Sequence, residues 1–317
     1  MNTTIQEMLQ GNLSDEEVCS SIISLRERGE TANDIFEYVK CISSHAVSVS
    51  PHGELLDVCG TGGSGLNRFN VSTASTFILS ALGVKVIKHG NRGSQRPNGS
   101  FDLLEKLGIN IEQSPTKIEE TIRVKNLGFV FAKHYHPSLK AVAKGRLLAG
   151  GRSIFNLAGP LSNPAKVTYQ VIGTADHSKA EILSEVCLKL GRKKSIVVYG
   201  EPGIDEVSIS GKTHVYECSN GKIKKYTIEP KDFGITPVDY GNIPGGDAED
   251  NMKIFLDLIE GTASESITDM VSLNAGIALY TAEKVDSIKK GYESAKKCIL
   301  TGLMKRQFEQ YVLAASS

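Results

Sequence analysis

The sequence has no tryptophan, no excess charge of either sign and no cysteine motif. The last two absences exclude classes of partner and of site. Thirty-six basic residues balance thirty-six acidic ones, so the net charge gives no reason to expect nucleic acid or an anionic membrane as a partner. The six cysteines form no C-x-x-C pair, disulfide pattern or zinc spacing. We expect them to be reduced thiols of a cytoplasmic protein.

Long hydrophobic runs are missing as well. The first residues, MNTTIQEMLQ, have neither the basic segment nor the apolar run of a signal peptide, and no apolar stretch approaches the length of a membrane span. We therefore expect no targeting signal and no membrane partner. What the chain does have is 317 residues with 40% hydrophobic content, enough for a sizeable core in one large domain or two ordinary ones.

Apolar strands alternate with helices from about residue 53, which predicts an α/β fold with a mainly parallel sheet flanked by helices. The predicted strands are 55–59, 84–87, 129–132, 168–172 and 195–198. Residues 213–229 predict a hairpin that turns at Asn220 and Gly221. The C-terminal part predicts helices over roughly 247–260, 264–283 and 286–312.

Two stretches outside this alternation predict a second, smaller domain. Residues 4 to about 46 have helical periodicity, and Ser14 begins a capping box. Residues 137–164 leave the strand-helix rhythm, with a predicted helix at 139–148. We predict a small helical domain at 1–50 with 137–164 inserted against it. Residues 51–136 and 165–317 then form the large α/β domain.

Residues 57–102 place two glycine- and amide-rich turns after the first two predicted strands. In the first turn, glycines at 60, 62, 63 and 65 free the backbone, and Asn70 and Ser72 open an apolar helix, so N–H groups converge where an anion is favoured. The G-x-G-x-x-G spacing also fits a dinucleotide site, but that needs an acidic residue after the second strand. That strand is followed by Lys88, His89 and Arg92, which suit phosphate.

The chain contains, in this order, GTGG, NVSTAS, KHGNR, HPSLKAVAKGR, GRSIFNLAGPLSNPA, GIDEVS, KDFG and GGDAEDN. This succession resembles the anthranilate phosphoribosyltransferase family of tryptophan biosynthesis over nearly the whole chain. The resemblance implies a small helical domain and a large α/β domain with 5-phosphoribosyl-1-pyrophosphate (PRPP) and Mg²⁺ between them. It also implies transfer of the phosphoribosyl group of PRPP to the amine of anthranilate, release of pyrophosphate, and a homodimer.

The resemblance assigns roles to individual residues. Those implied for PRPP are Gly60, Thr61, Gly62, Gly63, Asn70, Ser72, Thr73, Lys88 and Ser100. Those implied for anthranilate are Gly60, His89, Asn91, His136 and Arg146. The implied Mg²⁺ ligands are Ser72, Asp205 and Glu206, and the residues implied in catalysis are Lys88, Asn91 and Arg146.

The residue chemistry supports some of these roles and leaves others open. Adjacent carboxylates such as Asp205 and Glu206 offer the hard oxygen ligands that Mg²⁺ prefers, although a solvated acidic pair is the commoner arrangement. The fork of Arg146 fits a carboxylate in a bidentate manner. For the neighbouring Arg152, a role in holding the turn at 150–151 is favoured. His89 and His136 are equally compatible with packing and with contact to the acceptor.

The first turn also has ordinary structural explanations. Asn70 and Ser72 would be common helix caps, a role that can coexist with phosphate binding.

The chain departs from the family pattern at Ser64, where the family usually has an aspartate, and in a loop that contains Arg96 and Pro97 in place of small residues. Its N-terminal helical part is also shorter than usual in the family.

The departures keep alternative functions open. A phosphoribosyltransferase of the same fold with another aromatic acceptor is one alternative. A non-catalytic nucleic-acid-binding relative is another, and the balanced charge and retained acidic pair count against it. A pyrimidine nucleoside phosphorylase, which shares the fold, is the third, and the GRSIFN and DEVS motifs favour the transferase.

Overall fold

The computed structural model describes residues 2–66, 69–93 and 97–316. Within these residues, seven strands form one sheet in the order β3-β2-β1-β4-β5-β6-β7. They are β1 (Leu56–Gly60), β2 (Val86–Gly90), β3 (Leu127–Phe131), β4 (Tyr169–Gly173), β5 (Lys194–Gly200), β6 (Thr213–Ser219) and β7 (Lys222–Ile228). Strands β1 to β5 are parallel, and β6 and β7 add an antiparallel hairpin. The predicted α/β fold with a mainly parallel sheet is confirmed.

One strand boundary changes the position of two site residues. The sequence predicts that the second strand ends at 87, but β2 continues to Gly90 because it pairs with β3 through His89 and Val130. Lys88 and His89 therefore lie inside the strand rather than after it. Because side chains alternate along a strand, these two neighbours point to opposite faces of the sheet.

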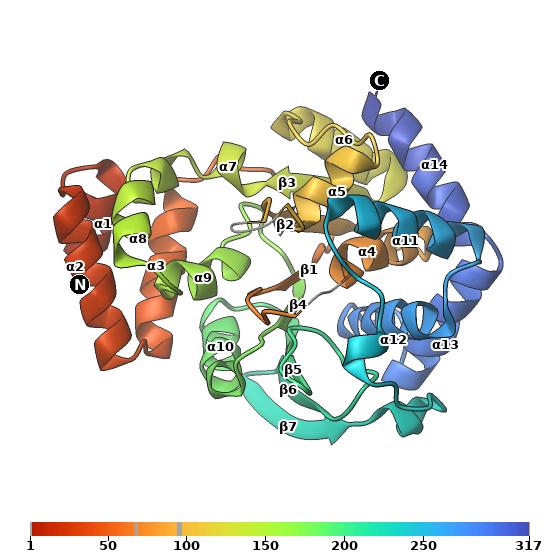
Figure 1. Ribbon diagram of the computed structural model, residues 1–317. Coiled ribbons are helices and arrows are strands. Elements are labelled where there is room, and N and C mark those ends of the chain that lie inside the picture. Colours follow the sequence, from red (N-terminus) through yellow and green to blue (C-terminus); the bar gives the residue numbers. More distant parts are fainter. Residues whose placement is uncertain (1, 67–68, 94–96, 317) are drawn as a thin grey trace.

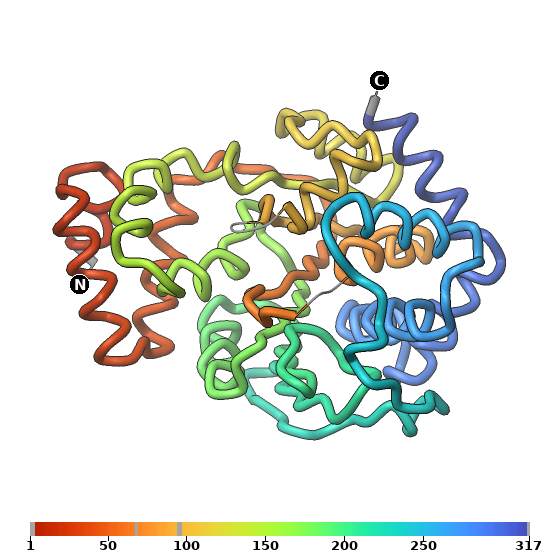
Figure 2. The backbone as a smooth tube through the Cα atoms, viewed as in Figure 1, coloured from red at the N-terminus to blue at the C-terminus, as the bar shows by residue number. Residues whose placement is uncertain are grey.

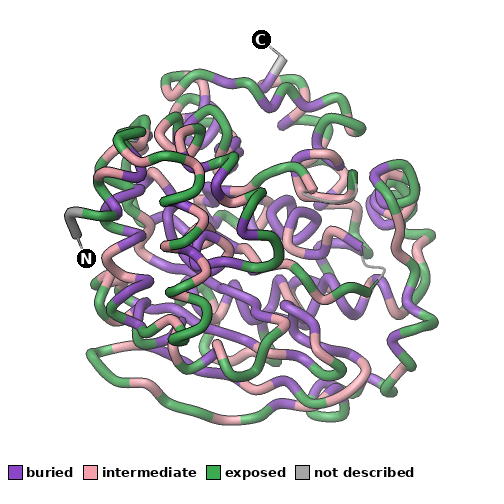
Figure 3. The backbone as a smooth tube through the Cα atoms, turned by 60° about the vertical axis from the view of Figure 1, so that its left-hand side comes forward, coloured by how far each residue is buried: buried purple, intermediate pink, exposed green. Residues whose placement is uncertain are grey.

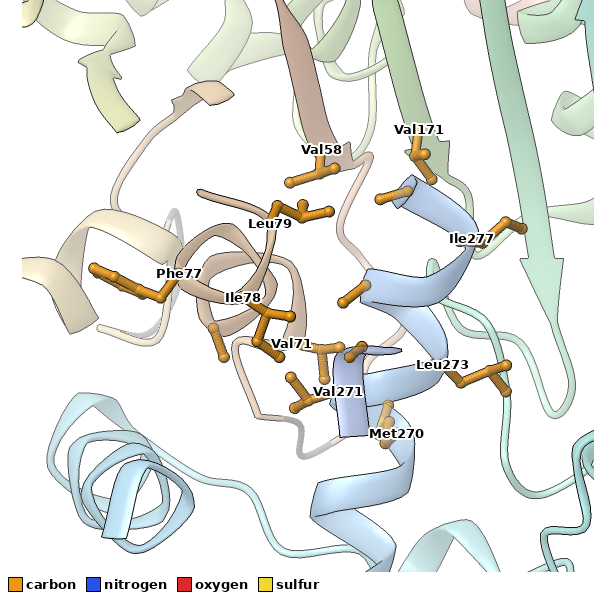
Figure 4. Close-up of a cluster of buried hydrophobic side chains, with 14 of the residues drawn as sticks. Val58, Val71, Phe77, Ile78, Leu79, Val171, Met270, Val271, Leu273 and Ile277 are labelled. Carbon is orange, nitrogen blue, oxygen red and sulfur yellow. The ribbon is translucent and has the colours of Figure 1, made fainter. Parts of the chain in front are cut away.

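One face of the sheet is covered by a layer of C-terminal helices with α4 (Figure 1). These helices are α4 (Val71–Ala81), α11 (Ala248–Glu260), α12 (Glu265–Thr281), α13 (Ile288–Leu300) and α14 (Leu303–Ser316), with α5 (Ser100–Lys106) beside them. The helix α6 (Pro115–Lys125) packs on the opposite face, where Ile118 and Ile122 share a cluster with Ile87 and Val130. Val58 of β1 and Val171 of β4 belong to the same buried cluster as Leu79 of α4 and Ile277 of α12 (Figure 4). This apolar layer fixes α4, and hence its N-terminus, against the sheet.

The other face carries α10 and the N-terminal helices, which form the left-hand part of Figures 1 and 2. The helices here are α1 (Asn2–Gln10), α2 (Asp15–Arg28), α3 (Ala32–Ser44), α7 (Ala132–Tyr135), α8 (Ala143–Ala149), α9 (Ile154–Ala158) and α10 (His177–Lys189). Ile35 of α3, Phe155 of α9 and Leu183 of α10 share one cluster with Ile172 of β4. The buried positions in Figure 3 run through the sheet and along the inner sides of the helices. The exact division into two domains stays a prediction.

Several local predictions can be compared with the observed elements. The predicted capping box at Ser14 is present, and Asn220 and Gly221 have φ of 49° and 73°, as a type I′ turn requires. The helix predicted at 139–148 is instead a 3₁₀ turn at Pro137–Lys140 followed by α8. The helix predicted at 286–312 is two helices, because Gly302 has a φ of +70° that ends α13. The remaining 3₁₀ turns are Gly159–Leu161, Pro230–Phe233 and Tyr240–Asn242.

Membrane spans were also searched for in the structure. Among the described residues, no helix is both long enough and apolar enough to cross a membrane.

Candidate active site

The motif residues gather where the strand order of the sheet reverses. β1 lies between β2 and β4, and the chain leaves β1 toward one side of the sheet and β4 toward the other. In open α/β sheets, ligands bind outside the carboxyl ends of the strands at such a switch point. The glycine turn follows β1, Gly90 ends β2, and Asp205 follows β5, so all three lie at the carboxyl edge.

The turn after β1 has the backbone that its glycines predict. Gly62, Gly63 and Gly65 have φ of 69°, 82° and 71°, a region that other residues rarely adopt. The backbone N–H of Gly62 donates a hydrogen bond of 2.7 Å to Oδ2 of Asp205. A carboxylate therefore occupies the place at the turn where an anion is expected. The Ser64 hydroxyl accepts from Leu66 N at 3.3 Å, and residues 67 and 68 lie outside the described part.

Four neighbouring strands end in glycine, and the Asp205–Glu206 segment packs directly on three of them, β1, β4 and β5. A Cβ at Gly60 would overlap Asp205 Oδ2, and one at Gly173 would overlap the Asp205 carbonyl oxygen. A Cβ at Gly200 would overlap the Glu206 carbonyl oxygen in the same way. The sequence reasoning missed Gly173 and Gly200. A glycine at the last position of β1, β4 and β5 alike was the signal for them.

Lys88 is buried on the α4 side of the sheet, directly below the turn. Its Nζ donates to the carbonyl oxygen of Val58 at 2.7 Å and to Oγ of Ser72 at 3.1 Å. Burial lowers the pKa of Lys88, and the nearby carboxylates, first Asp57 and then Glu206 and Asp205, act in the opposite direction. The ammonium group is thus held in place by one strand and one helix before any substrate binds.

The N-terminus of α4 carries polar atoms that its own fold leaves unused. Asn70 occupies the cap position but makes no side-chain cap bond, and its Nδ2 instead donates to Asn98 O at 3.0 Å. Asn70 is therefore the N-cap residue by position but does not cap the helix through its side chain, and the Ser72 hydroxyl, inside α4, accepts from Lys88. Within the described residues, Oδ1 of Asn70 and Oγ1 of Thr73 are buried without a hydrogen-bond partner. Such atoms are costly unless a ligand or water meets them.

The predicted metal ligands line one small cavity. Ser72, Asp205 and Glu206 surround it together with Asn274 and the apolar residues Val58 and Val198. In the part of the chain that the structure describes, no group of three or more histidine, cysteine or acidic side chains forms a metal cage. Two carboxylates and a hydroxyl fit Mg²⁺, which usually takes few protein ligands and completes its shell with phosphate oxygens and water.

The loop after β2 is tied at both ends. Asp102 accepts through Oδ2 from the N–H groups of Gly93 and Gly99, at 2.7 and 2.8 Å. The exposed Asn91 accepts a weak bond of 3.4 Å from the Ser100 hydroxyl at its backbone oxygen, which places the two predicted site residues together. Arg96 lies outside the described residues.

His89 and His136 form a buried pair on the opposite face from Lys88. Their Nε2 atoms are 3.0 Å apart, so one ring donates and the other accepts. Burial lowers the pKa of His136 to about 4 and holds that of His89 well below its usual value. Both rings are neutral at pH 7. A third buried group, Asp57, supports this strand by accepting from His89 N at 3.2 Å and from Gln170 Nε2 at 3.0 Å.

Arg146 and Arg152 differ in the contacts that their guanidinium groups make. The Arg146 guanidinium lies 4.8 Å from the centre of the Phe155 ring and, among the described residues, has no hydrogen-bond or ion-pair partner. Burial lowers its pKa. Arg152, for which the sequence favours a role at the turn of 150–151, instead donates from Nη2 to Thr61 O at 3.2 Å. Arg26 holds that turn, with 2.6 Å from its Nη1 to Gly150 O.

The geometry can now be compared with known proteins. A family model described as "Glycosyl transferase family, a/b domain" matches residues 52–304. The chain is similar to the anthranilate phosphoribosyltransferase of Persephonella marina, with 42% identity over 294 residues that cover 92% of this chain and 87% of that protein.

Two solved structures show the same similarity in three dimensions. The first is anthranilate phosphoribosyltransferase from Thermus thermophilus, with a TM-score of 0.94 and 32% identity over 100% of this chain and 94% of that one. The second is the enzyme from Saccharomyces cerevisiae in complex with PRPP and Mg, with a TM-score of 0.89 and 26% identity over 98% and 90%.

Proposed function

Since the chain belongs to the anthranilate phosphoribosyltransferase family, we propose that it transfers the phosphoribosyl group of PRPP to the amine of anthranilate and releases pyrophosphate. One observation carries the proposal beyond family membership. The glycine turn, the N-terminus of α4 and the Asp205–Glu206 segment converge at one switch point of the sheet. This arrangement combines amide donors, a buried ammonium group and hard oxygen ligands, which are the groups that a pyrophosphate with a divalent cation requires.

PRPP is expected to bind with its pyrophosphate at the turn of residues 60–63. Among the described residues, Thr73 Oγ1 and Asn70 Oδ1 are buried without a partner. The Thr73 hydroxyl can donate to a phosphate oxygen, and the Asn70 amide oxygen can accept from a hydroxyl group of the substrate. Lys88 places a positive charge beside Ser72 at the same helix end. Ser100 is proposed to contact PRPP from the start of α5. Together these groups bind the leaving group and orient the anomeric carbon.

Mg²⁺ is the proposed cofactor, and Asp205, Glu206 and Ser72 are the residues that would hold it. When bound, it supplies positive charge that neutralises the departing pyrophosphate. Since Asp205 accepts from Gly62 N without a ligand, the protein already holds this carboxylate at the edge of the turn. The protein's own contribution is a fixed arrangement of acidic oxygens that needs little rearrangement before binding.

Anthranilate is proposed to bind on the side of Arg146, with Gly60, His89, Asn91 and His136 nearby. The unpaired guanidinium of Arg146 would receive the carboxylate in a bidentate manner, which also orients the aromatic ring. The amine of an arylamine is neutral at pH 7, so a dedicated base is less needed than in a hydrolase, and the proton that the nitrogen loses as the N–C bond forms can pass to water or to the departing pyrophosphate. Catalysis is then mainly positioning and stabilisation of charge, with Lys88 and the turn amides at the leaving pyrophosphate.

We propose further that the enzyme is a homodimer located in the cytoplasm, with the small helical domain of residues 1–50 and 137–164 as a unit. Leu147 and Leu148 of α8 are 80% and 58% exposed, which supports a contact surface in this region. All six cysteines are free thiols, as suits a reducing compartment. Light scattering of the wild type and of Leu147→Glu would test the dimer, since the charged variant is expected to be monomeric.

The direct test of the function follows the loss of anthranilate fluorescence with PRPP and Mg²⁺. We expect turnover that depends on both, and no turnover when ribose 5-phosphate replaces PRPP. Other aromatic amines and acids serve as competing acceptors, because Ser64 and the loop around Pro97 depart from the family pattern. Turnover of another acceptor but not of anthranilate would overturn the proposed substrate and keep the transferase chemistry.

A further inference from the structure

Arg152 follows a sharp turn whose shape is set by two glycines. Gly150 and Gly151 have φ of 57° and 64°, so the chain reverses between α8 and α9. Arg26 of α2 donates from Nη1 to Gly150 O at 2.6 Å and from Nη2 to Ala149 O at 3.1 Å. Arg26 also donates to Arg152 O at 3.3 Å. The backbone that presents Arg152 is therefore fixed by a residue of the N-terminal helices.

The Arg152 side chain reaches the glycine turn after β1. Its Nη2 donates to Thr61 O at 3.2 Å, and a Cβ at Gly63 would overlap its Nη1. A residue 91 positions away in the sequence thus lies directly on the turn. Two separate reasons require glycine at position 63. Its φ is +82°, and the Arg152 guanidinium occupies the space that a side chain would need.

No acidic side chain of the described residues neutralises the charge of Arg152. Within the described residues, no carboxylate lies within ion-pair distance of its guanidinium, and the recorded hydrogen bond uses one of its five N–H donors. By contrast, Arg92, which is exposed as Arg152 is, is held by Glu105 through two bonds of 2.8 and 2.6 Å. Ser64, one residue beyond Gly63, supplies a hydroxyl and no charge. The remaining donors of Arg152 are therefore available to an anion at the turn.

We propose that Arg152 binds the pyrophosphate group of PRPP, and that Arg26 is a positioning residue that holds the Arg152 backbone. The inference rests on the proposed function for the identity of the substrate. A planar guanidinium binds phosphate oxygens in a bidentate manner, so Arg152 adds a cation from the helical side of the site to Lys88 from the sheet side. Binding of the pyrophosphate would then be shared between both sides.

The test measures binding of inorganic pyrophosphate with Mg²⁺ by isothermal titration calorimetry, and the Michaelis constants for both substrates. Arg152→Gln is expected to weaken pyrophosphate binding and raise the KM for PRPP by about 10- to 100-fold, as loss of a charged hydrogen bond does. The KM for anthranilate should stay within about twofold. Arg152→Lys should recover part of the loss, since it keeps the charge but not the fork.

Two further variants separate the proposed role from a general effect of charge. Arg26→Gln should shift the KM for PRPP in the same direction as Arg152→Gln, by a smaller factor. Arg306→Gln removes an exposed arginine on α14 and should change neither constant. Thermal unfolding reports whether each variant is folded, and Arg152→Lys serves as the test if Arg152→Gln is not.

The outcomes distinguish this inference from the proposed function. Unchanged pyrophosphate binding in Arg152→Gln, or an effect confined to the KM for anthranilate, would overturn the role of Arg152 and leave the transferase reaction intact. If Arg152→Gln loses pyrophosphate binding and the wild type does not use anthranilate, the role of Arg152 is supported and the proposal that anthranilate is the acceptor is overturned. Because pyrophosphate binds without an acceptor, the two results are independent.

Discussion

The two sides of the proposed site differ in how the protein holds Lys88 and Asp205 on one side and Arg146 on the other. On the phosphate side, Lys88 bonds to Val58 O and Ser72, and Asp205 accepts from Gly62 N. On the acceptor side, Arg146 rests on the Phe155 ring without an ion-pair partner among the described residues. The first side is built on strand ends, and the second on the short helices between 132 and 158.

This difference shows how one fold can prepare two kinds of binding. The phosphate side is fixed by backbone contacts, so its groups are positioned before substrate binds and act on the leaving group. On the acceptor side, the proposed ion-pair partner of the Arg146 guanidinium is the carboxylate of anthranilate. Changes on the phosphate side should therefore affect stability, turnover and the affinity for PRPP, and changes on the acceptor side should affect the affinity for anthranilate.

The largest effect is expected where the phosphate side is most tightly packed. Gly173→Ala would place a Cβ in the space of the Asp205 carbonyl oxygen, so the segment must move. We expect a loss of about 3 kcal/mol or more in the free energy of unfolding, together with loss of activity. Urea unfolding measures the first quantity. Gly159→Ala is the matched control, because its Cβ would meet nothing within 4 Å. Equal stability of the two variants would contradict the packing argument.

The next effect concerns charge without a change of shape. Asp205→Asn keeps an oxygen that can accept from Gly62 N but loses the negative charge that suits Mg²⁺. We expect kcat to fall by about 100-fold and the Mg²⁺ concentration for half-maximal activity to rise. Titration of activity with Mg²⁺ gives both values. Asp286→Asn, which removes an exposed carboxylate paired only with Lys290, should behave as the wild type. If Asp205→Asn depends on Mg²⁺ as the wild type does, Asp205 is not a metal ligand.

The acceptor side should respond differently to truncation. Arg146→Ala is expected to raise the KM for anthranilate by about 10- to 100-fold, because it removes a charged bidentate contact, while kcat changes little. Steady-state kinetics with each substrate varied in turn separates the two effects. Arg146→Lys should lie between the wild type and the alanine variant. A rise confined to the KM for PRPP would place Arg146 on the phosphate side and break the comparison.

The effect that is smallest at neutral pH, and that grows only as the pH falls, is a pH dependence of stability from the buried histidine pair. The pKa of His136 is about 4 in the folded state, below its usual value of 6.5. Above pH 6.5 the ring is neutral in both states, and as the pH falls from 6.5 to 4 the unfolded chain takes up a proton that the folded one does not. Stability should therefore fall over this window by up to about 3 kcal/mol, and the lowered pKa of His89 acts in the same direction.

The control for this prediction is His136→Gln, which cannot titrate. Chemical unfolding at several pH values between 6.5 and 4 should show a smaller slope in the variant than in the wild type. The same slope in both proteins would mean that His136 is protonated while folded, in conflict with its burial beside His89.

Much of the fold was predictable because its signals are local in the sequence. The alternation of apolar strands and helices predicts the parallel sheet, and the left-handed backbone at Gly62 and Gly63 follows from their glycines. Predictions failed where a boundary depends on distant partners. β2 extends through Lys88 and His89 because β3 lies beside it. The break between α13 and α14 is different, since Gly302 is visible in the sequence but the helical periodicity continues across it.

The candidate site was predictable in part, for the same reason. Motif residues such as Ser72 and Asp205 can be identified along the chain, and the structure brings them to one cavity at the edge of the sheet. The contact of Arg152 with Thr61 joins residues of two remote segments, and no spacing predicts it. The need for glycine at 173 and 200 likewise depends on a segment that passes over both strand ends.

The sequence by itself therefore determined the α/β alternation, the left-handed glycine turn after β1 and the residue types available at the proposed site. These follow from backbone freedom, periodicity and side-chain chemistry, which act over a few neighbouring residues. Only the tertiary structure decided which polar groups form hydrogen bonds with one another. Lys88 pairs with Ser72, Asp205 with Gly62, and Arg152 with Thr61 because parallel strands bring their carboxyl ends to one edge, where remote segments pack within hydrogen-bond distance.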